Sequence, residues 1–224
     1  MIRGIYTSAS GMIAETTRTD TIANNLANVG TAGYKKDTAV TSEFGDMLLN
    51  RINDGPQSTI GRIGVGTAVA EIGVSHAVGA FRQTGNNLDL AIAGKGFFVI
   101  DTPGGERYTR NGTFMLNQQG ELMTQEGMPV AGEGGVIRIP ADTKEINSTG
   151  EGRIYADNTE VGRLRLVGVD DERLLRKEGN SLFRSEGADI GAFSGRVEQG
   201  CLEMSNSNVI NEMVNLISAY RAYE

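Results

Sequence analysis

The chain has 224 residues, with 21 Lys and Arg against 28 Asp and Glu, a formal net charge of -7 at pH 7, and no apolar run near the roughly 18 residues that a membrane-spanning helix needs. The acidic balance argues against nucleic-acid binding, because phosphates are bound by clustered Lys and Arg. The first residues, MIRGIYTSASGM, lack the apolar core of a secretory signal peptide, so export would need another route.

An apolar stripe runs along residues 1–30. Its members recur at alternating steps of three and four, the spacing of a coiled-coil helix: Ile2, Ile5, Ala9, Met12, Thr16, Thr19, Ala23 and Leu26. Five Thr residues between Ile5 and Asn28 each lower the helix propensity by up to about 0.7 kcal/mol relative to Ala. The helix must therefore be packed against a partner to be stable.

The end of this helix is marked by IANNLANVGTAGYKK, residues 22–36. Its asparagines continue a helix only weakly, and Gly30 or Gly33 can end it. We interpret the stretch as a joint between the helix and the next segment rather than as a ligand loop, with asparagine amides available to bond neighbouring backbones. The predicted joint residues are Asn24, Asn25, Asn28, Gly33 and Tyr34.

Residues 31–65 are predicted to form an extended connector. They include a possible short helix with an apolar side made by Phe44, Leu48, Leu49 and Ile52. The following GPQSTIGRIG, residues 55–64, is rich in turn residues and is predicted to be mobile.

A period of two replaces the helical period over residues 66–204, which indicates strands. The alternating positions are Ala68, Ala70, Ile72 and Val74, then Leu88, Leu90 and Ile92, then Leu164 and Leu166. Asn111-Gly112 predicts a tight hairpin turn, because both central residues of that turn need positive φ. Further turns are predicted at Gly94-Lys95-Gly96, Pro103-Gly104-Gly105 and Gln119-Gly120. The middle of the chain is therefore expected to be a β-domain of hairpins.

A second helical stripe occupies residues 205–224. It is formed by Val209, Met213, Leu216, Tyr220 and Tyr223, with Ile210, Val214 and Ile217 beside them. Neither a glycine cap nor a breaker follows AYRAYE, so we expect this helix to be cut short.

The two terminal helices are natural partners. Residues 1–36 hold four basic and two acidic residues, and residues 201–224 hold one basic and three acidic, so their net charges are +2 and -2. One pair of helices cannot cover two wide apolar faces, so we expect further copies of the chain to cover them. The alternative is that the helices dock onto the β-domain of their own chain. The predicted assembly interface comprises Ile5, Met12, Leu26, Val209, Met213, Leu216, Ile217 and Tyr220.

Catalytic and ligand-binding patterns are weak. His76 is the one histidine and is expected at a structural position in a strand. Cys201 has no partner for an internal disulfide, and no spacing of residues suggests a zinc site. Residues 61–69, GRIGVGTAV, lack the GK[ST] of a phosphate loop. Phe97 and Phe98 point to opposite faces of a strand, so at most one could contact a ligand and a core position is favoured. We predict no enzyme, no cofactor and no metal.

Three long motifs together resemble the bacterial flagellar rod and hook proteins, the axial subunits of the basal body. The N-terminal motif is SASGM with NNLANVGTAGYKK. The central motif is NNLDLAIAGKGFFVI with RYTRNGTFMLNQQGELMTQEGMPVAG, and the C-terminal motif is VEQGCLEMSNSNVINEMVNLISAYRAYE. TPGGERYTRNG and MPVAGEGGVIRIP are most similar to the proximal-rod subunit, with the distal-rod subunit as the alternative. NNLDL stands where relatives often have a proline after the first asparagine.

The resemblance implies a mainly β protein with a central β-domain and with N- and C-terminal helices in a coiled-coil-like domain. Residues 1–30 and 205–224 would form the assembly domain, 31–65 the connector and 66–204 the outer domain. The resemblance also implies export by the flagellar type III apparatus without a cleaved signal, and a place in the rod that crosses the periplasm. Copies of the chain and other rod or hook axial proteins would be the partners, with a mechanical role in transmitting torque through a hollow shaft. The alternative from another class is a β-domain that binds glycan or a receptor.

Overall fold

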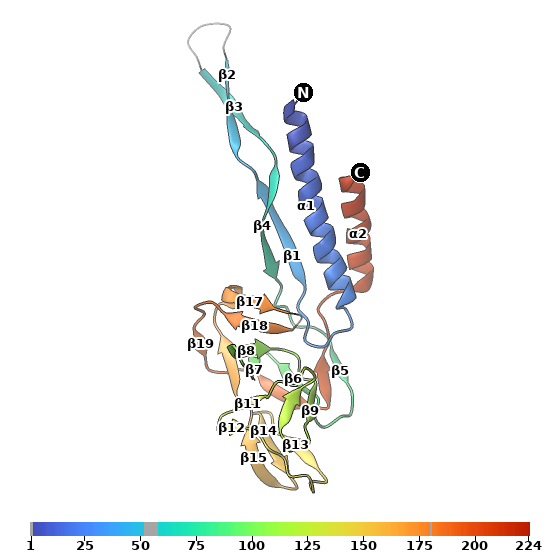
Figure 1. The fold of residues 1–224 in the computed structure, drawn as a ribbon, viewed down its shortest axis with the longest axis vertical. Coiled ribbons are helices and arrows are strands. Elements are labelled where there is room, and N and C mark those ends of the chain that lie inside the picture. The colour runs from blue at the N-terminus through green and yellow to red at the C-terminus, as the bar shows by residue number, and fades with distance from the viewer. Residues whose placement is uncertain (1, 52–57, 180) are drawn as a thin grey trace. The chain divides into compact units, whose positions relative to one another are not determined.

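The computed structural model describes residues 2–51, 58–179 and 181–224. The chain is mainly β with one α-helix at each end, as predicted (Figure 1). It divides into a helical unit, made of Met1–Ala27, Asp37–Ser75 and Asn208–Glu224, and a β-rich unit, made of Asn28–Lys36 and His76–Ser207. This division differs from the predicted one, because most of the predicted connector belongs with the terminal helices.

The helical unit contains α1 (Ile2–Ala27), β1 (Asp37–Glu43), β2 (Asp46–Arg51), β3 (Ser58–Gly64), β4 (Thr67–Val74) and α2 (Val209–Tyr223). Strand β1 pairs antiparallel with β4, and β2 pairs antiparallel with β3. Helix α1 packs along α2 and against the β1–β4 pair (Figure 1). A two-stranded ribbon is marginal alone in water, so the packing of α1 on β1 and β4 stabilises both.

The short helix considered around Phe44 to Ile52 is wrong. The segment forms strand β2, whose Leu48 and Leu49 lie opposite Arg62 and Gly61 of β3. A short apolar run does not distinguish a helix from a strand, and here the pairing with β3 decides. Ile52 and the first three residues of GPQSTIGRIG lie outside the described residues, and the rest of that stretch belongs to β3.

The β-rich unit is built from short strands and one 3-10 turn. These are β5 (Phe81–Gln83), β6 (Leu90–Ala93), β7 (Phe97–Thr102), β8 (Gly105–Thr109), β9 (Phe114–Leu116), β10 (Leu122–Thr124), β11 (Ala131–Gly132), β12 (Gly135–Val136), β13 (Ile146–Ser148), β14 (Arg153–Ala156), β15 (Thr159–Arg163), β16 (Leu166–Val169), η1 (Glu172–Leu174), β17 (Leu175–Glu178), β18 (Leu182–Ser185), β19 (Ile190–Gly191), β20 (Arg196–Gln199) and β21 (Cys201–Glu203). The largest sheet has the order β17-β18-β8-β7-β16-β19, and β6 and β5 pair with β20 and β21.

The core of this unit lies on both sides of β7. Phe98 is buried among Leu90, Ile100 and Phe114, and its ring meets that of Phe114 edge-on at 5.2 Å. Phe97 points to the other face and packs on Phe183, with ring centres 5.9 Å apart. The prediction that the two adjacent rings face opposite ways and occupy core positions is therefore confirmed.

The predicted hairpin at Asn111-Gly112 is wrong. Strands β8 and β9 on either side of it do not pair with each other, and neither residue has positive φ. Gly112 instead lies where the chain crosses β6: its O accepts a hydrogen bond from Leu90 N at 3.0 Å, and a Cβ on it would lie 1.6 Å from Leu90 O. Glycine is needed here for close approach of two backbones rather than for a turn.

Other turns follow their sequence signals. Gln119-Gly120 joins β9 to β10, with Gly120 at φ 76°, and Pro103-Gly104-Gly105 joins β7 to β8. A two-residue turn that we did not predict joins β14 to β15, where Asp157 and Asn158 have φ of 46° and 69°. Asp and Asn tolerate this conformation better than other residues with a Cβ, which explains the position.

Candidate assembly surface

Helix α1 buries a narrow face within the helical unit. The buried residues are Ala14, Thr21, Ile22 and Asn25. The threonines are accommodated because their hydroxyls bond the preceding turn: Thr16 Oγ1 donates to Met12 O and Thr21 Oγ1 to Thr17 O, both at 2.8 Å. Such bonds satisfy the threonine hydroxyls but add little stability to the helix. Helix α1 is therefore stabilised mainly by packing, as its low helix propensity predicted.

The heptad stripe predicted for α1 lies mostly outside this buried face. Ile5 is 68% exposed and Met12 is exposed, while Leu26 is half-buried. Tyr6 and Ile13 add two further exposed apolar side chains. The apolar periodicity of α1 is therefore not explained by its packing inside this chain.

Helix α2 has the same arrangement. Its buried residues are Glu212 and Ala219, and Leu216 is half-buried between them in the helical sequence. Its exposed apolar residues include Val209, Ile210, Met213, Val214, Ile217 and Tyr220. The helix begins at Asn208, whose Oδ1 accepts from Ile210 N at 3.0 Å and from Asn211 N at 3.2 Å. This cap fixes the first turn and so the direction in which the apolar side chains point.

We call these exposed residues the outer apolar face. They are Ile5, Tyr6, Met12, Ile13, Val209, Ile210, Met213, Val214, Ile217 and Tyr220. The contact of α1 with α2 and with the β1–β4 pair leaves all of them at least 40% exposed. Monomeric proteins rarely leave so many large apolar side chains together in water.

Thr7 and the adjacent SASGM motif join α1 to the turn between β3 and β4. Thr7 Oγ1 donates to Val65 O at 3.0 Å, and Ser10 Oγ accepts from Thr67 N at 3.3 Å. Gly66 lies between these bonds, and a Cβ on it would lie 2.5 Å from Ser10 Oγ. Small residues on both sides therefore allow helix and turn to meet.

The predicted joint residues fall in both units. Asn25 is buried in the helical unit, where its amide bonds the backbone of Asp37, and Asn24 is exposed on the same helix. Asn28 begins the β-rich unit, where its O accepts from Thr31 N at 3.1 Å. Asn24 and Asn25 thus belong to the helical unit, and Asn28 belongs to the β-rich unit.

Gly33 and Tyr34 are buried in the β-rich unit. Gly33 has φ 68°, its N donates to Glu203 O at 2.7 Å, and a Cβ on it would lie 2.3 Å from Asn111 N. The ring of Tyr34 is fully buried, and Lys177 Nζ lies 3.8 Å from its centre. Both residues thus hold the segment 28–36 against the rest of this unit.

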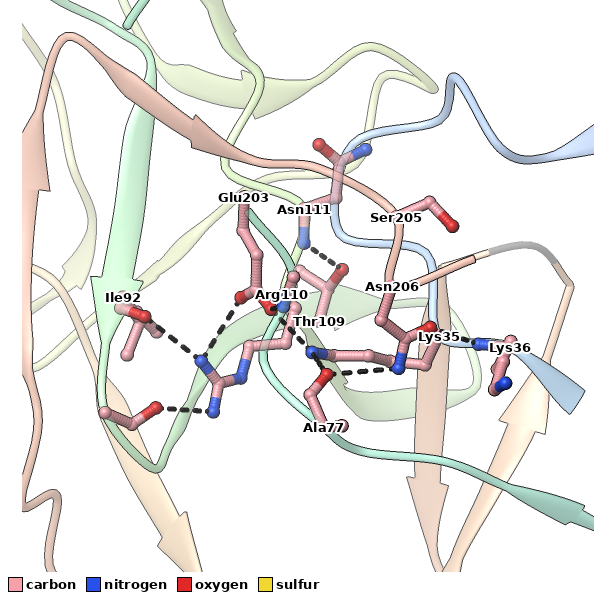
Figure 2. Close-up of polar contacts among 12 residues, drawn as sticks. Lys35, Lys36, Ala77, Ile92, Thr109, Arg110, Asn111, Glu203, Ser205 and Asn206 are labelled. Atoms are coloured by element: carbon pink, nitrogen blue, oxygen red, sulfur yellow. Dashed lines mark hydrogen bonds and ion pairs between the residues drawn. The ribbon is translucent and has the colours of Figure 1, made fainter. Parts of the chain in front are cut away.

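A buried charged cluster lies beside them (Figure 2). Glu203 Oε1 accepts from Lys35 Nζ at 2.5 Å and from Gly79 N at 2.9 Å, and Glu203 Oε2 accepts from Arg110 Nη1 at 3.3 Å. Lys35 Nζ also donates to Ala77 O at 2.8 Å, and Arg110 donates to Ile92 O in β6 and to Gly94 O just after it. All three charged side chains are almost completely buried.

Burial and charge act in opposite directions on this cluster. The pKa values of Lys35 and of Arg110 lie below their ordinary values. Burial lowers both, and the opposing effect of the Glu203 carboxylate is smaller. His76 lies nearby, packed on Phe97 and Phe183, and burial together with the two cations lowers its pKa to about 4. The sequence prediction missed the cluster, because nothing local in YKK or YTRNG distinguishes a buried cation from a surface one.

Features needed for other functions are sparse. Among the described residues, no group of His, Cys, Asp and Glu could hold a metal ion, and no helix is both long and apolar enough to cross a membrane. An open depression of about 580 Å³ on the β-rich unit is lined partly by Arg153, Tyr155 and Arg196, but Arg153 already pairs with two glutamates. Phe81 is the large aromatic residue that this unit leaves more than 40% exposed in its described part.

Comparison with known proteins matches three stretches of the chain. Residues 5–35 match the family described as flagella basal body rod protein, residues 91–156 the D1 domain of flagellar hook protein FlgE/F/G, and residues 198–224 the C-terminal region of flagellar basal body rod FlgEFG protein. The first match contains α1 from residue 5 onward and the joint, and the last contains Glu203 and α2.

Full-length relatives agree with these matches. The chain is 35% identical to the flagellar basal-body rod protein FlgG of Bacillus subtilis, with all of this chain and 92% of the relative covered. It is 34% identical to FlgG of Agrobacterium fabrum, again over all of this chain and 92% of the relative. It is 33% identical to the flagellar basal-body rod protein FlgF of Caulobacter vibrioides, over all of this chain and 90% of the relative.

Proposed function

Because this chain belongs to the family of flagellar basal-body rod proteins, we propose that it is a structural subunit of the rod and that copies assemble through the outer apolar face. The observation that supports this role is the exposure of the predicted heptad stripes. Ile5 and Met213 are 68% and 50% exposed although both helices are already packed in the helical unit.

The free energies of apolar burial and of association favour a polymer over a simple dimer. Burying an exposed Ile, Met or Tyr contributes about 1.5–3 kcal/mol when complete, so ten half-exposed side chains contribute on the order of 10 kcal/mol. Association itself costs roughly 4–15 kcal/mol in lost translational and rotational freedom. One neighbour that covers part of the face therefore gains little, whereas neighbours that together cover both helices give a stable assembly.

The proposed packing is a coiled-coil-like contact between copies. The stripes of α1 and α2 repeat every three and four residues, which suits knobs-into-holes packing of long helices. Closed into a ring and repeated along an axis, such contacts build a hollow shaft that transmits torque from motor to hook. This role is mechanical and needs no catalytic group or cofactor.

The family also suggests partners and a location. We propose that the subunit contacts other rod and hook axial proteins at the ends of its own segment, in the basal body where the rod crosses the periplasm. Export by the flagellar type III apparatus is part of the same proposal and rests on the family.

A proximal position in the rod is the one we propose, with a distal position as the alternative. The resemblance of TPGGERYTRNG and MPVAGEGGVIRIP to the proximal subunit supports it. Labelling of the chain in imaged basal bodies tests the position, since label near the inner-membrane ring is expected and label at the hook end contradicts it.

Cysteine crosslinking between different copies tests the assembly surface. Met12→Cys is produced in one chain and Ile217→Cys in another, both with Cys201→Ser, so that a heterodimeric disulfide can form only between copies. We expect crosslinks in isolated basal bodies. Asn215→Cys in place of Ile217→Cys is the matched control, because Asn215 is exposed on α2 but is not apolar. Equal crosslinking of Ile217→Cys and Asn215→Cys to Met12→Cys would contradict assembly through the outer apolar face.

The alternative of another class is a glycan- or receptor-binding β-domain. The depression beside Tyr155 is the feature that favours it. Binding of cell-wall fragments that is lost in Tyr155→Ala, together with rods that form normally when the outer apolar face is made polar, would select this alternative.

A further inference from the structure

The buried charged cluster of the β-rich unit lies where the chain leaves that unit. The chain passes between the units after residues 27, 36, 75 and 207. Three segments of the β-rich unit lead to these points, and we call them the neck segments: residues 28–36, 76–80 and 203–207. Lys35, Ala77 and Glu203 each lie on a different neck segment, and Lys35 Nζ donates to both Ala77 O and Glu203 Oε1.

Hydrogen bonds connect the neck segments pairwise. Gly33 N donates to Glu203 O, and Lys36 N donates to Asn206 Oδ1 at 2.8 Å, which joins the first segment to the third. Asn206 Nδ2 donates to Ala77 O at 3.1 Å and Met204 N to Ala80 O at 2.9 Å, which joins the third to the second (Figure 2). Residues separated by up to 170 positions are thus held at one place.

Glu203 is the electrostatic centre of this arrangement. Its two oxygens accept from two buried cations, Lys35 on the first neck segment and Arg110 on the loop that follows β8. Removing a buried carboxylate leaves both cations desolvated and uncompensated, whereas removing Lys35 leaves Arg110 and Glu203 as a neutral pair. The arrangement therefore depends more on Glu203 than on either cation.

The apolar core of the unit borders the cluster, because Arg110 donates to the backbone O of the core residue Ile92. The core is made by residues between Leu90 and Val197, among them the fully buried Phe98, Ile100 and Leu122, and it contains no member of the three neck segments. The apolar packing of the core side chains and the hydrogen bonds that join the neck segments are therefore different contacts.

We propose that Glu203, Lys35 and Arg110 form a clamp that gathers the neck segments and so fixes the position from which the chain leads to both terminal helices. Glu203 is then a positioning residue for assembly, not a member of the assembly surface. This role rests on the proposed function, because it matters only if the terminal helices assemble. Nothing in the outer apolar face needs to change for the clamp to control assembly.

Amide hydrogen exchange on the full chain tests the clamp directly. In Glu203→Gln we expect the amides of Gly33, Lys36 and Gly79 to exchange at least roughly tenfold faster, while amides of β7 keep their protection. Lys35→Met should give a smaller increase, because a neutral pair remains. Glu178→Gln is the matched control, since Glu178 pairs with Arg107 at the surface of the same unit and should leave all these amides unchanged.

The order of the variants separates charge from packing. If the cluster only fills space, Lys35→Met and Glu203→Gln will loosen the neck segments equally, and the clamp is overturned. It is also overturned if β7 loses protection together with the neck segments, since the cluster is then part of the core.

Incorporation into basal bodies tests the positioning role. Cells that produce Glu203→Gln at the wild-type level should contain at least roughly tenfold less of the chain in isolated basal bodies than cells that produce Glu178→Gln. Wild-type incorporation of Glu203→Gln overturns the positioning role. Failure of the unmodified chain to enter basal bodies contradicts the proposed function instead, and the exchange comparison still decides whether the clamp exists.

Discussion

The side chain of Asn25 pairs with the backbone of Asp37 in both directions. Its Nδ2 donates to Asp37 O at 2.7 Å, and its Oδ1 accepts from Asp37 N at 2.9 Å. The amide thus occupies the place of a neighbouring strand at the first residue of β1, and it is 2% exposed in the last turns of α1. One side chain therefore joins the end of the helix to the start of the ribbon on which the helix packs.

Asn25→Ala should destabilise the helical unit. Truncation leaves a buried backbone N–H and C=O without these partners, which costs about 1–3 kcal/mol. We expect faster amide exchange at Asp37 and through β1, with the β-rich unit unchanged. Asn215→Ala is the matched control because Asn215 is exposed on α2, and a loss of equal size there would show that any asparagine on a terminal helix has the same effect.

Gly66→Ala should loosen the contact between α1 and the turn before β4. The added Cβ would lie 2.5 Å from Ser10 Oγ, so the hydroxyl must rotate away from Thr67 N and give up that bond. The loss of one partly buried hydrogen bond costs about 1 kcal/mol. The rate of hydrogen exchange at the amide of Thr67 measures the loss of this hydrogen bond. Gly64→Ala has open space around its Cβ and is the control; an equal change there would trace the effect to strand propensity.

Features set by neighbours in the sequence were predictable. The helical stripes around Met12 and Met213 and the alternation around Ile72 follow from side-chain direction alone, so both helices and β4 are found where expected. The cluster depends on distant residues: Lys35 and Glu203 are 168 positions apart, and no local pattern indicates that the chain brings them together.

Asn111-Gly112 shows the same limit for a strong local signal. The pair is a common hairpin turn, but Leu90 and Gly33 approach it from segments about twenty and eighty residues away and use its small size instead. A hairpin turn and a backbone crossing lead to opposite expectations for the substitution of Gly112. In a hairpin of this type Asn in place of Gly112 would be tolerated, whereas at a backbone crossing every side chain is excluded.

Gly112→Ala should therefore strongly destabilise the β-rich unit. Its Cβ would lie 1.6 Å from Leu90 O, which is backbone and can move only if β6 moves. Overpacking of this kind costs about 3 kcal/mol or more. Urea unfolding of the full chain, followed by amide exchange in β6 and β9, measures it. Gly134→Ala has no atom near its Cβ and should change stability little; a tolerated Gly112→Asn would restore the hairpin interpretation.

His76 should make the β-rich unit sensitive to mild acid. Its pKa is lowered from 6.5 to about 4 by burial and by the charges of Lys35 and Arg110, so the unfolded chain binds the proton more readily than the folded chain. The contribution of neutral His76 to the free energy of unfolding is therefore fully present above about pH 6.5, and it is lost as the pH decreases toward 4.

Between pH 7 and pH 5 the expected loss is about 1–2 kcal/mol, after allowance for partial exposure of the ring. His76→Phe keeps the ring packing on Phe97 and Phe183 and removes the titration, so its unfolding midpoint in urea should change less over the same range. His76 is the one histidine of the chain, so few other groups titrate in this window. Parallel pH profiles for the wild type and His76→Phe would show that the ring is equally protonated in both states and that the cluster does not lower its pKa.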